Sequence, residues 1–195
     1  MVAPSNLQLG DVRLEPLTSA HAEALAAASA DGEIGALPYT NAPTSRIESA
    51  SAYIAHALAG QAAGTMLPFA VVWNGEVIGS TRYYDIEPTV PNCAIGYTWY
   101  AQRAQRTHVN TNCKRLLLGH AFEVLGMQAV YFHTSHLNLR SQAAIERLGA
   151  RRDGVLRNHK RHKDGSLRDT VAYSILAREW PTIRERLERR LAGPL

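Results

Sequence analysis

Two segments of the sequence contain the side chains best suited to bind an anion. The first runs from the aromatic stretch CAIGYTWY at residues 93–100, through AQRAQRTHVN at 101–110, into a helical pattern. A loop that enters a helix N-terminus presents unpaired backbone N–H groups at the positive end of the helix dipole. The side chains that add donors there are Arg103, Arg106, Thr107, Asn110 and Thr111. The pattern indicates an anion site, although an ordinary strand-to-helix turn would share its outline.

The second segment is NLRSQAAIERLG, in which Asn138 and Ser141 stand three residues apart at the start of a short helix. Asn and Ser at this spacing can cap a helix N-terminus, and capping needs no functional explanation. Gly149 is placed to end the helix.

Strands and helices alternate around these segments. In the first half we expect a strand at 11–16, a helix capped by Ser19, and a second helix opened by an S-x-x-E capping box of Ser45 and Glu48. Apolar runs on both sides of Asn-Gly at 74–75 predict a β-hairpin.

The second half has the pattern of further strands at 93–100 and 129–134, separated by a helix whose apolar stripe ends at Gly126. Two strands joined at 164–165 and a terminal helix that starts near Pro181 complete the chain. Because no repeat, linker or low-complexity segment interrupts this pattern, we expect one α+β (mixed α/β) domain.

Composition excludes several classes of protein. A chain of 195 residues with 46% hydrophobic residues can bury a core, which argues against intrinsic disorder. Its longest apolar stretch, at 67–73, is far shorter than the ~20 residues that span a bilayer. The first ten residues have no secretory pattern, and Cys93 and Cys113 form no C-x-x-C motif. We therefore expect a cytoplasmic protein without a membrane partner, a disulfide framework or a metal site.

The formal net charge of +4 hides an asymmetry. Residues 1–99 contain three basic and nine acidic side chains, whereas residues 100–195 contain 18 basic and 8 acidic ones. This split suggests an anionic ligand for the second half and a cationic one for the first, unless each half simply exposes its own solvated charges.

The order strand, basic loop, long helix, strand, N-x-x-S and short helix resembles that of the GCN5-related N-acetyltransferase (GNAT) superfamily, in particular its RimJ/RimL-type branch. The resemblance extends from DVRLEPL near the start to TVAYSILAREW near the end, and rests most on IGYTWY, QRTHVNT and NLRSQAAIERLGA. It implies a GNAT fold, with a twisted, mostly antiparallel sheet of about seven strands that is splayed at strands 4 and 5 and flanked by helices. A single domain would cover 1–195, with its core at 10–178 and a C-terminal helix at 179–195.

The resemblance also implies an enzyme that moves an acetyl group from acetyl-CoA to a primary amine, by direct attack in a ternary complex and without a metal. The acceptor would be a protein N-terminus, such as that of a ribosomal protein, or a small amine such as a polyamine, amino acid or antibiotic. Whether the enzyme is a homodimer stays open.

Each matched residue then has an implied role. Ser141 would lie near the thioester sulfur, bind the coenzyme and act as the general acid for the departing thiolate, while Asn138 would bond the pantetheine chain. The fourth strand would pair with the pantetheine arm through Thr98, Trp99 and Tyr100. The pyrophosphate would lie on Gln105, Arg106, Thr107, His108, Val109, Asn110 and Thr111.

The phosphate loop departs from the superfamily pattern Q/R-x-x-G-x-G/A. Here His108 and Asn110 occupy the two small positions. Asn tolerates left-handed backbone conformations, and the histidine can be accommodated if its side chain points away from the ligand. We expect the loop to bind pyrophosphate through the same backbone N–H groups.

The acceptor side and the general base are less defined by the sequence. We expect Leu37, Pro38 and Tyr39, in an irregular segment between two helices, to line the acceptor side with Tyr84 and Asp85. The acidic first half would suit a cationic amine. The general base could be a carboxylate, Asp85 or Glu87, but both could instead be solvated acids. His133 or His136 could titrate near neutral pH, but each could also be a packing residue.

A binding protein of another class stays an alternative. RNHKRHKDG together with basic residues of the 103–115 segment could form an RNA-binding patch, although aromatic stacking platforms are not interleaved with it. A non-catalytic acyl-CoA-binding protein is a further alternative.

Overall fold

A hairpin at the centre of the sheet sets the register of its neighbours. The computed structural model describes residues 5–37 and 39–193. Strands β3 (Met66–Trp73) and β4 (Glu76–Glu87) turn at Asn74 and Gly75, which both have positive φ. This confirms the Asn-Gly prediction, because a two-residue hairpin of this hand needs positive φ at both positions.

The described residues form one eight-stranded sheet in the order β1-β2-β3-β4-β5-β6-β8-β7. Its other strands are β1 (Leu7–Leu9), β2 (Val12–Pro16), β5 (Asn92–Tyr100), β6 (Ala129–Ser135), β7 (Arg151–Arg161) and β8 (Leu167–Leu176). Only the pairing of β5 with β6 is parallel. The mostly antiparallel sheet was therefore predicted correctly, and β1 accounts for the strand beyond the seven expected.

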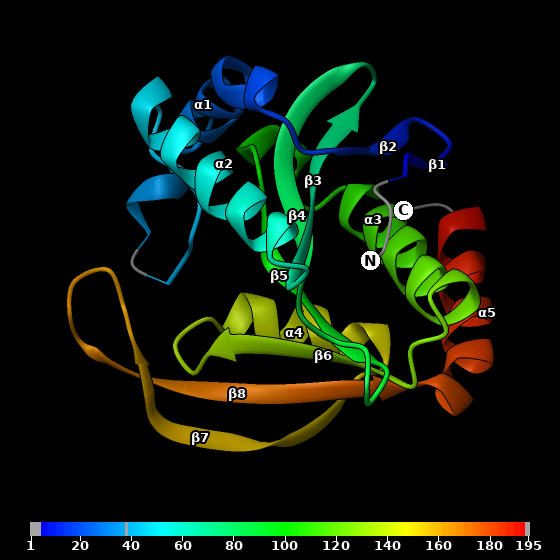
Figure 1. Cartoon of the computed structure of the whole chain (residues 1–195). Helices are drawn as coiled ribbons and strands as arrows, with labels where there is room; N and C mark the ends of the chain where they lie inside the picture. The colour runs from blue at the N-terminus through cyan, green and yellow to red at the C-terminus, as the bar shows by residue number, and fades with distance from the viewer. Residues whose placement is uncertain (1–4, 38, 194–195) are drawn as a thin grey trace.

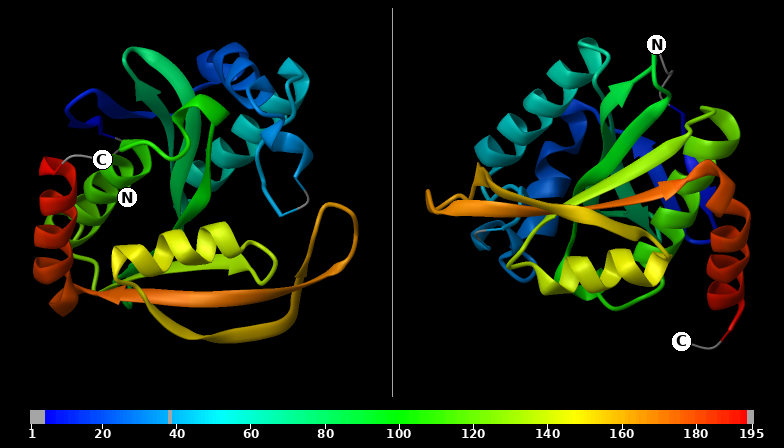
Figure 2. Two further views of the ribbon diagram at one scale, coloured as in Figure 1. Left: turned by 180° about the vertical axis from the view of Figure 1, so that it is seen from behind. Right: turned by 90° about the horizontal axis from the view of Figure 1, so that it is seen from below.

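Five α-helices cover the described part of the sheet (Figures 1 and 2). Helices α1 (Ala22–Ala30) and α2 (Ile47–Ala62) pack against β3 and β4, whereas α3 (Val109–Gly119) packs against β1, β2 and α5 (Trp180–Ala192). Helix α4 (Leu139–Leu148) lies along β6. Side chains from both halves of the chain meet in one apolar core, which extends from Val12 to Leu187.

Two of the predicted helix starts differ from the structure. Thr18 and His21 form a capping box at a short 3₁₀ turn, Ser19–His21, so α1 begins three residues after Ser19. Helix α2 begins at Ile47 without a side-chain cap. The predicted box of Ser45 and Glu48 is wrong, because Arg46 rather than Ser45 is at the N-cap position. The hydroxyl of Ser49 accepts a hydrogen bond from the Thr44 N–H.

Short helical turns fill the connections. They are the 3₁₀ turns Ile34–Ala36, Gln102–Ala104 and Ala177–Glu179 and the π-helical turn His120–Val124, which extends α3. Among the described residues, no helix is long and apolar enough to cross a membrane.

Close contact between β4 and β5 predicts that Gly79→Ala destabilises the fold. A Cβ atom at Gly79 would lie 2.1 Å from the Trp99 carbonyl oxygen, and backbone in the middle of a sheet cannot easily move aside. We expect the free energy of unfolding to fall by about 3 kcal/mol, measured by urea denaturation.

Gly154→Ala is the matched control, because Gly154 also lies in a strand and a Cβ atom there would contact nothing within 4 Å. Equal stability of the two variants would contradict the predicted clash.

Candidate active site

Strand β5 separates from β6 in the middle of the sheet, and this gap is the centre of the candidate site. The two strands are paired only from Asn92–Ala129 to Ala94–Tyr131. Beyond Ala94, that edge of β5 has no partner strand. Side chains bond the carbonyls of Tyr97 and Tyr100, and the backbone groups of this edge that remain unpaired can bond a ligand. This confirms the splay expected between strands 4 and 5, which are β5 and β6 here because β1 adds one strand at the start.

A β-bulge bends β5 at the same place. Between the pairs Arg82–Gly96 and Ser80–Trp99, β5 has one more residue than β4, and Tyr97 has a φ of 51°. Gly96 leaves room for the ring of Tyr84, because a Cβ atom at Gly96 would lie 2.7 Å from that ring.

Lys114 is buried between the two diverging strands. Its Nζ donates a 3.1 Å hydrogen bond to Thr98 Oγ1 on β5 and lies 5.8 Å from the centre of the Phe132 ring on β6. Thr98 Oγ1 is also 2.8 Å from Thr81 Oγ1. Burial lowers the pKa of Lys114 to about 8. The alternative RNA-binding patch of the 103–115 segment would include Lys114, but the exposed fraction of 6% excludes this side chain from such a surface.

The other β5 residues expected to bind the coenzyme connect the strand to its surroundings. Trp99 is buried and packs edge-on against Tyr53, with ring centres 6.3 Å apart. The hydroxyl of Tyr100 donates to Asn110 Oδ1 at 3.2 Å, and burial raises the pKa of Tyr100 well above its usual value. The carbonyl of Tyr100 accepts from Gln105 Nε2 at 3.0 Å. The end of β5 is thus bonded to the loop and to the first turn of α3.

The start of α3 faces the expected phosphate position with free donors. Asn112 N–H donates the first helical bond to the His108 carbonyl, and Val109 N–H donates to Thr107 Oγ1. Asn110 and Thr111 precede the first helical bond, so their N–H groups stay available for an anion. The anion site inferred from the sequence stays a prediction at this helix start.

His108 points away from this helix start, as its place in the loop requires. Its Nε2 lies 2.9 Å from Asp11 Oδ1, and its ring packs edge-on against Trp73. Trp73 Nε1 donates to the same carboxylate at 2.8 Å. Although burial raises the pKa of Asp11, hydrogen bonds from His108 and Trp73 outweigh this effect and lower it.

The two arginines of the loop have different partners. Arg103 is 3.1 Å from Asp31 and 2.9 Å from Glu76, so its charge is shared with the acidic first half. Arg106 is exposed, has a φ of 63° and forms none of the ion pairs found among the described residues. Of the two, Arg106 is the one free to contact a phosphate group.

Helix α4 begins on the far side of the gap (Figure 2). Asn138 caps it, since its Oδ1 accepts a 3.0 Å bond from Ser141 N–H. The capping interpretation is confirmed, and Asn138 Nδ2 remains a donor. Ser141 is half-buried in the first turn. The α3 and α4 starts are tied together, because Arg140 donates to Gln105 Oε1 at 3.0 Å.

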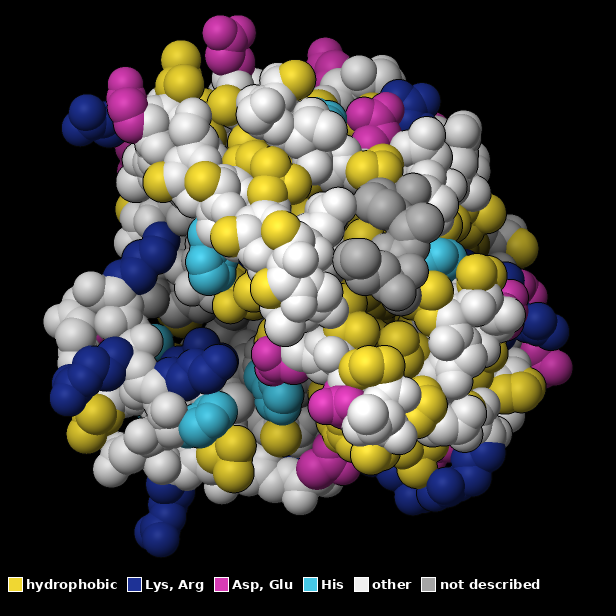
Figure 3. Space-filling view, in the orientation of Figure 1, with side chains coloured by type: hydrophobic (Ala, Val, Ile, Leu, Met, Phe, Trp, Pro, Cys, Tyr) yellow, Lys and Arg dark blue, Asp and Glu magenta, His cyan; other side chains and the backbone are white. Residues whose placement is uncertain are grey.

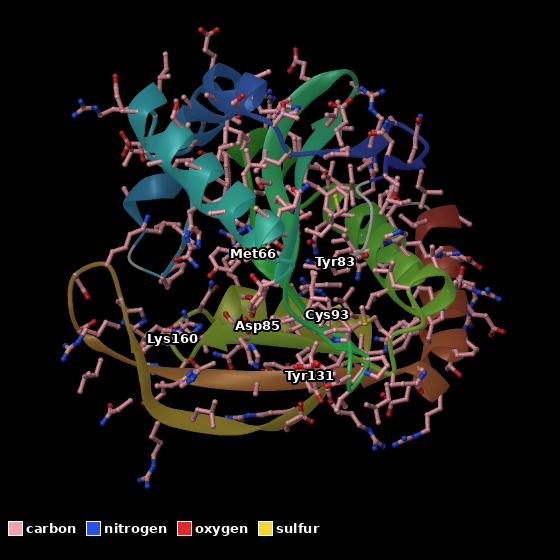
Figure 4. The ribbon with its side chains drawn as sticks, viewed as in Figure 1. Met66, Tyr83, Asp85, Cys93, Tyr131 and Lys160 are labelled. Carbon is pink, nitrogen blue, oxygen red and sulfur yellow. The ribbon has the colours of Figure 1, made fainter. Side chains whose placement is uncertain are left out.

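A tyrosine and a histidine bridge the gap between β4 and β6. Tyr84 is buried, and its hydroxyl lies 3.1 Å from His133 Nδ1. Burial raises the pKa of Tyr84 and lowers that of His133, while the nearby Asp85 carboxylate acts to raise both. Figure 4 shows Asp85 near β6, with Lys160 of β7 farther to the left. Sequence reasoning considered His133 singly and missed its partner across the sheet.

A cavity of about 570 Å³ adjoins this region, between the segment that precedes α2 and the tip of the β7–β8 hairpin. Its lining includes Tyr53 and His56 from α2, Tyr97 from β5 and Lys163 from the hairpin. A smaller cavity of about 150 Å³ shares Lys163 with it. Figure 3 shows this hollow on the left, with basic and histidine side chains around it.

The expected acceptor residues are only partly at these cavities. Tyr39 lines the smaller cavity. Leu37 lines neither cavity, and Pro38 lies outside the described residues. Nor is the surface acidic: none of the described lining residues is Asp or Glu. The charged side chains of the cavities come from the β7–β8 hairpin, in the basic second half of the chain. The sequence did not reveal that this hairpin lies beside the segment before α2.

The described residues contain no group of three or more His, Cys, Asp or Glu side chains placed to hold a metal ion. Cys93 and Cys113 are free and buried, and burial raises their pKa values to about 12 and about 11.

Comparison with known proteins supports a transferase site. Residues 11–151 match the family model described as "Acetyltransferase (GNAT) domain". Over 110 residues, the chain is 29% identical to the Bacillus subtilis (strain 168) protein named "Putative ribosomal N-acetyltransferase YdaF". This match covers 56% of the chain and 59% of that relative.

Solved structures share the whole fold. A "putative acetyltransferase" from T. thermophilus is 36% identical and superposes with a TM-score of 0.86, covering 98% of this chain and 99% of that one. The structure of Mycobacterium smegmatis RimJ in complex with CoA-disulfide is 22% identical, with a TM-score of 0.81 and coverage of 96% and 93%.

Lys114→Met tests the buried ammonium group between the strands. The folded-state pKa of about 8 lies below the ordinary value of 10.5, so the unfolded chain binds more protons between these pH values. The wild type should therefore gain stability relative to the variant as the pH rises through this range. We expect a relative gain of up to about 3 kcal/mol between roughly pH 7 and pH 10, measured by urea denaturation.

Lys160→Met, which removes an exposed lysine of β7, is the control and should keep the pH dependence of the wild type. If the unfolding free energies of wild type and Lys114→Met ran parallel with pH, the buried charge would be contradicted.

Proposed function

Because the chain belongs to the GNAT acetyltransferase family, we propose that it moves an acetyl group from acetyl-CoA to a primary amine, namely the amino terminus of a peptide. The observation that carries this proposal is the edge of β5 beyond Ala94, which is unpaired where β6 turns away. Two similar proteins support the choice of donor and acceptor: the relative named as a ribosomal N-acetyltransferase and the RimJ structure with a coenzyme A derivative. We propose that residues 1–195 act as a single domain in this acetyl transfer.

The gap has the donors that a pantetheine arm and a pyrophosphate require. The β5 edge would pair with the amides of the arm, as a neighbouring strand would. The pyrophosphate would lie on the free N–H groups of Asn110 and Thr111, with Arg106 beside it. Since Asp11 holds the His108 ring away, the larger residue at this position leaves the helix start open.

Transfer joins the acceptor nitrogen to the acetyl carbon and breaks the bond between that carbon and sulfur. The carbonyl oxygen becomes negative during attack, and a backbone N–H of the β5 edge would stabilise it. The departing thiolate needs a proton, which we assign to the hydroxyl of Ser141, and the hydroxyl then recovers a proton from solvent.

The acceptor amine must lose its proton, and His133 is suited to take it. Burial lowers its pKa, so the ring is neutral near pH 7 and can accept a proton. Tyr84 orients the ring through Nδ1. Asp85 favours the imidazolium that results, whereas Lys160 and Arg168 disfavour it and so favour return of the proton to solvent.

The structure gives less support to the part of an RNA-binding patch that the 103–115 segment would supply. Of the basic residues considered for an RNA patch, Lys114 is buried and Arg103 and Arg115 form ion pairs with Asp31, Glu76 and Glu188. Buried and paired charges are poor contacts for a phosphate backbone.

The direct test of the function combines a binding titration with a transfer assay. We expect acetyl-CoA to bind, and thiol release from it to depend on added peptides that begin with Ala, Ser or Met. Polyamines, amino acids and aminoglycosides form the comparison set. Absence of coenzyme binding would contradict the proposal, and transfer to a small amine alone would reassign the acceptor.

Ser141→Ala should lower kcat by about 100-fold or more, because the leaving thiolate loses its proton donor. The affinity for acetyl-CoA should change little, because Ser141 contributes one hydroxyl among many contacts. Steady-state rates across pH, together with a coenzyme titration, measure both quantities.

Ser51→Ala is the control, since Ser51 is exposed on α2. An unchanged kcat and pH profile for Ser141→Ala would remove Ser141 as the general acid.

A further inference from the structure

The cavities on the acceptor side carry positive charge without matching carboxylates. Three cationic side chains line them, namely Arg161, Lys163 and Arg168 from the β7–β8 hairpin. None of the three takes part in the ion pairs found among the described residues. The other described residues that line the two cavities are neutral or histidine, so no carboxylate in the lining balances these charges.

The hydrogen bonds of these residues leave donors free. Lys163 Nζ donates to the carbonyl oxygens of Gly35 and Ala42, at 2.9 and 3.1 Å, and thereby fixes the hairpin tip beside the segment before α2. Arg161 donates one bond, to the Gly165 carbonyl. Arg168 Nε is buried without a hydrogen-bond partner, and burial lowers the pKa of this guanidinium.

A fourth cation lies directly behind the larger cavity. Arg82 is fully buried on β4, with its guanidinium carbon 4.6 Å from the centre of the Tyr53 ring and 4.3 Å from that of Tyr97. Both rings line the cavity. One nitrogen of Arg82 donates to the sulfur of Met66, whereas Nε and the other terminal nitrogen have no partner. A buried charge that lacks an anionic partner is costly, and an anion nearby would offset the cost.

The carboxylates that stand beside these cations in the sequence are bonded elsewhere. Asp164, next to Lys163, accepts bonds from the N–H and hydroxyl of Ser166. Asp169, next to Arg168, accepts from Asn158 N–H. Asp85 acts on Tyr84 and His133, at the place proposed for the amine, and lines neither cavity. Arg168 also acts on Tyr84 and His133, so it lies near both the place proposed for the amine and the smaller cavity. Arg161 and Lys163 continue the positive charge along the cavities.

We propose that the acceptor is a peptide amino terminus followed within its first few residues by Asp or Glu, whose carboxylates are bound by Arg168, Arg161 and Lys163. This inference deepens the proposed function and rests on it. The amine would lie near Asp85 and His133, and the chain would run from there between the hairpin and α2.

The size of the space favours a peptide over a small amine. The larger cavity has the volume of about 19 liquid water molecules, and a second cavity continues from it past Lys163. An amino acid or a simple polyamine would leave most of this space empty, whereas several residues of an extended peptide would occupy both cavities.

Three seven-residue peptides with the same first residue test this proposal. Their next positions are acidic (Asp and Glu), amide (Asn and Gln) or basic (Lys). We expect kcat/KM for the acidic peptide to exceed that of the amide peptide by about 10-fold or more, mainly through a lower KM, with the basic peptide slowest. Added salt should reduce the preference, because it screens exposed charges.

Arg168→Gln should reduce the preference for the acidic peptide to about 3-fold or less, and Arg168→Glu should reverse it in favour of the basic peptide. Arg157→Gln is the matched control, because Arg157 is exposed on the same hairpin and lines neither cavity. This control should keep the preference of the wild type. Reversal by a charge change separates recognition from loss of folding.

The outcomes distinguish this inference from the function on which it rests. Equal transfer to acidic and amide peptides would overturn the acidic acceptor and leave the acetyltransferase in place. Faster transfer to free aspartate or glutamate than to the acidic peptide would overturn the peptide acceptor. Coenzyme binding without transfer to any amine would overturn the proposed function itself.

Discussion

The divergence of β5 from β6 is the constraint on which the rest of the structure depends. Two paired strands satisfy each other's backbone groups, and separating them inside a protein costs free energy unless something replaces the bonds. The bulge at Tyr97 and the absence of a side chain at Gly96 bend β5, while Lys114 and Phe132 occupy the base of the gap. The N-termini of α3 and α4 are attached to the same gap. A thioester arm that pairs with the free edge would restore the missing bonds.

The distribution of charge has a different meaning in three dimensions than along the chain. Part of the basic excess of the second half is paired with acidic residues, as in the contacts of Arg103 with Asp31 and Glu76. Another part lies on the β7–β8 hairpin and faces the acceptor-side cavities, where Arg168 has no counter-ion among the described residues. Arg106 is exposed and forms none of the ion pairs found among the described residues, so it stays available for the proposed coenzyme phosphates. The basic half therefore contributes charge on both sides of the gap, whereas the first half forms most of the larger cavity but contributes no carboxylate to its described lining.

Local patterns predicted the elements well, because their causes are local. Asn74-Gly75 forms the hairpin and Asn138 caps α4, and both depend on residues within one turn of chain. The box of Ser45 and Glu48 failed because α2 begins at Ile47, with Arg46 rather than Ser45 at the N-cap position. Contacts between distant residues left no local signal: Tyr84 meets His133, His108 meets Asp11, and Lys163 reaches Gly35 and Ala42. The proposed coenzyme side follows an ordered motif and could be expected from the sequence, whereas the proposed acceptor side is built by such distant contacts.

Amide hydrogen exchange with and without acetyl-CoA tests the central claim most directly. If the free edge of β5 pairs with the coenzyme, exchange should slow in the segment 95–100 and at the start of α3, residues 109–111. The tip of the β7–β8 hairpin, residues 162–166, should exchange as before. Saturating coenzyme that protects none of the 95–100 segment would contradict the account, because the gap between β5 and β6 would then not be where the donor binds.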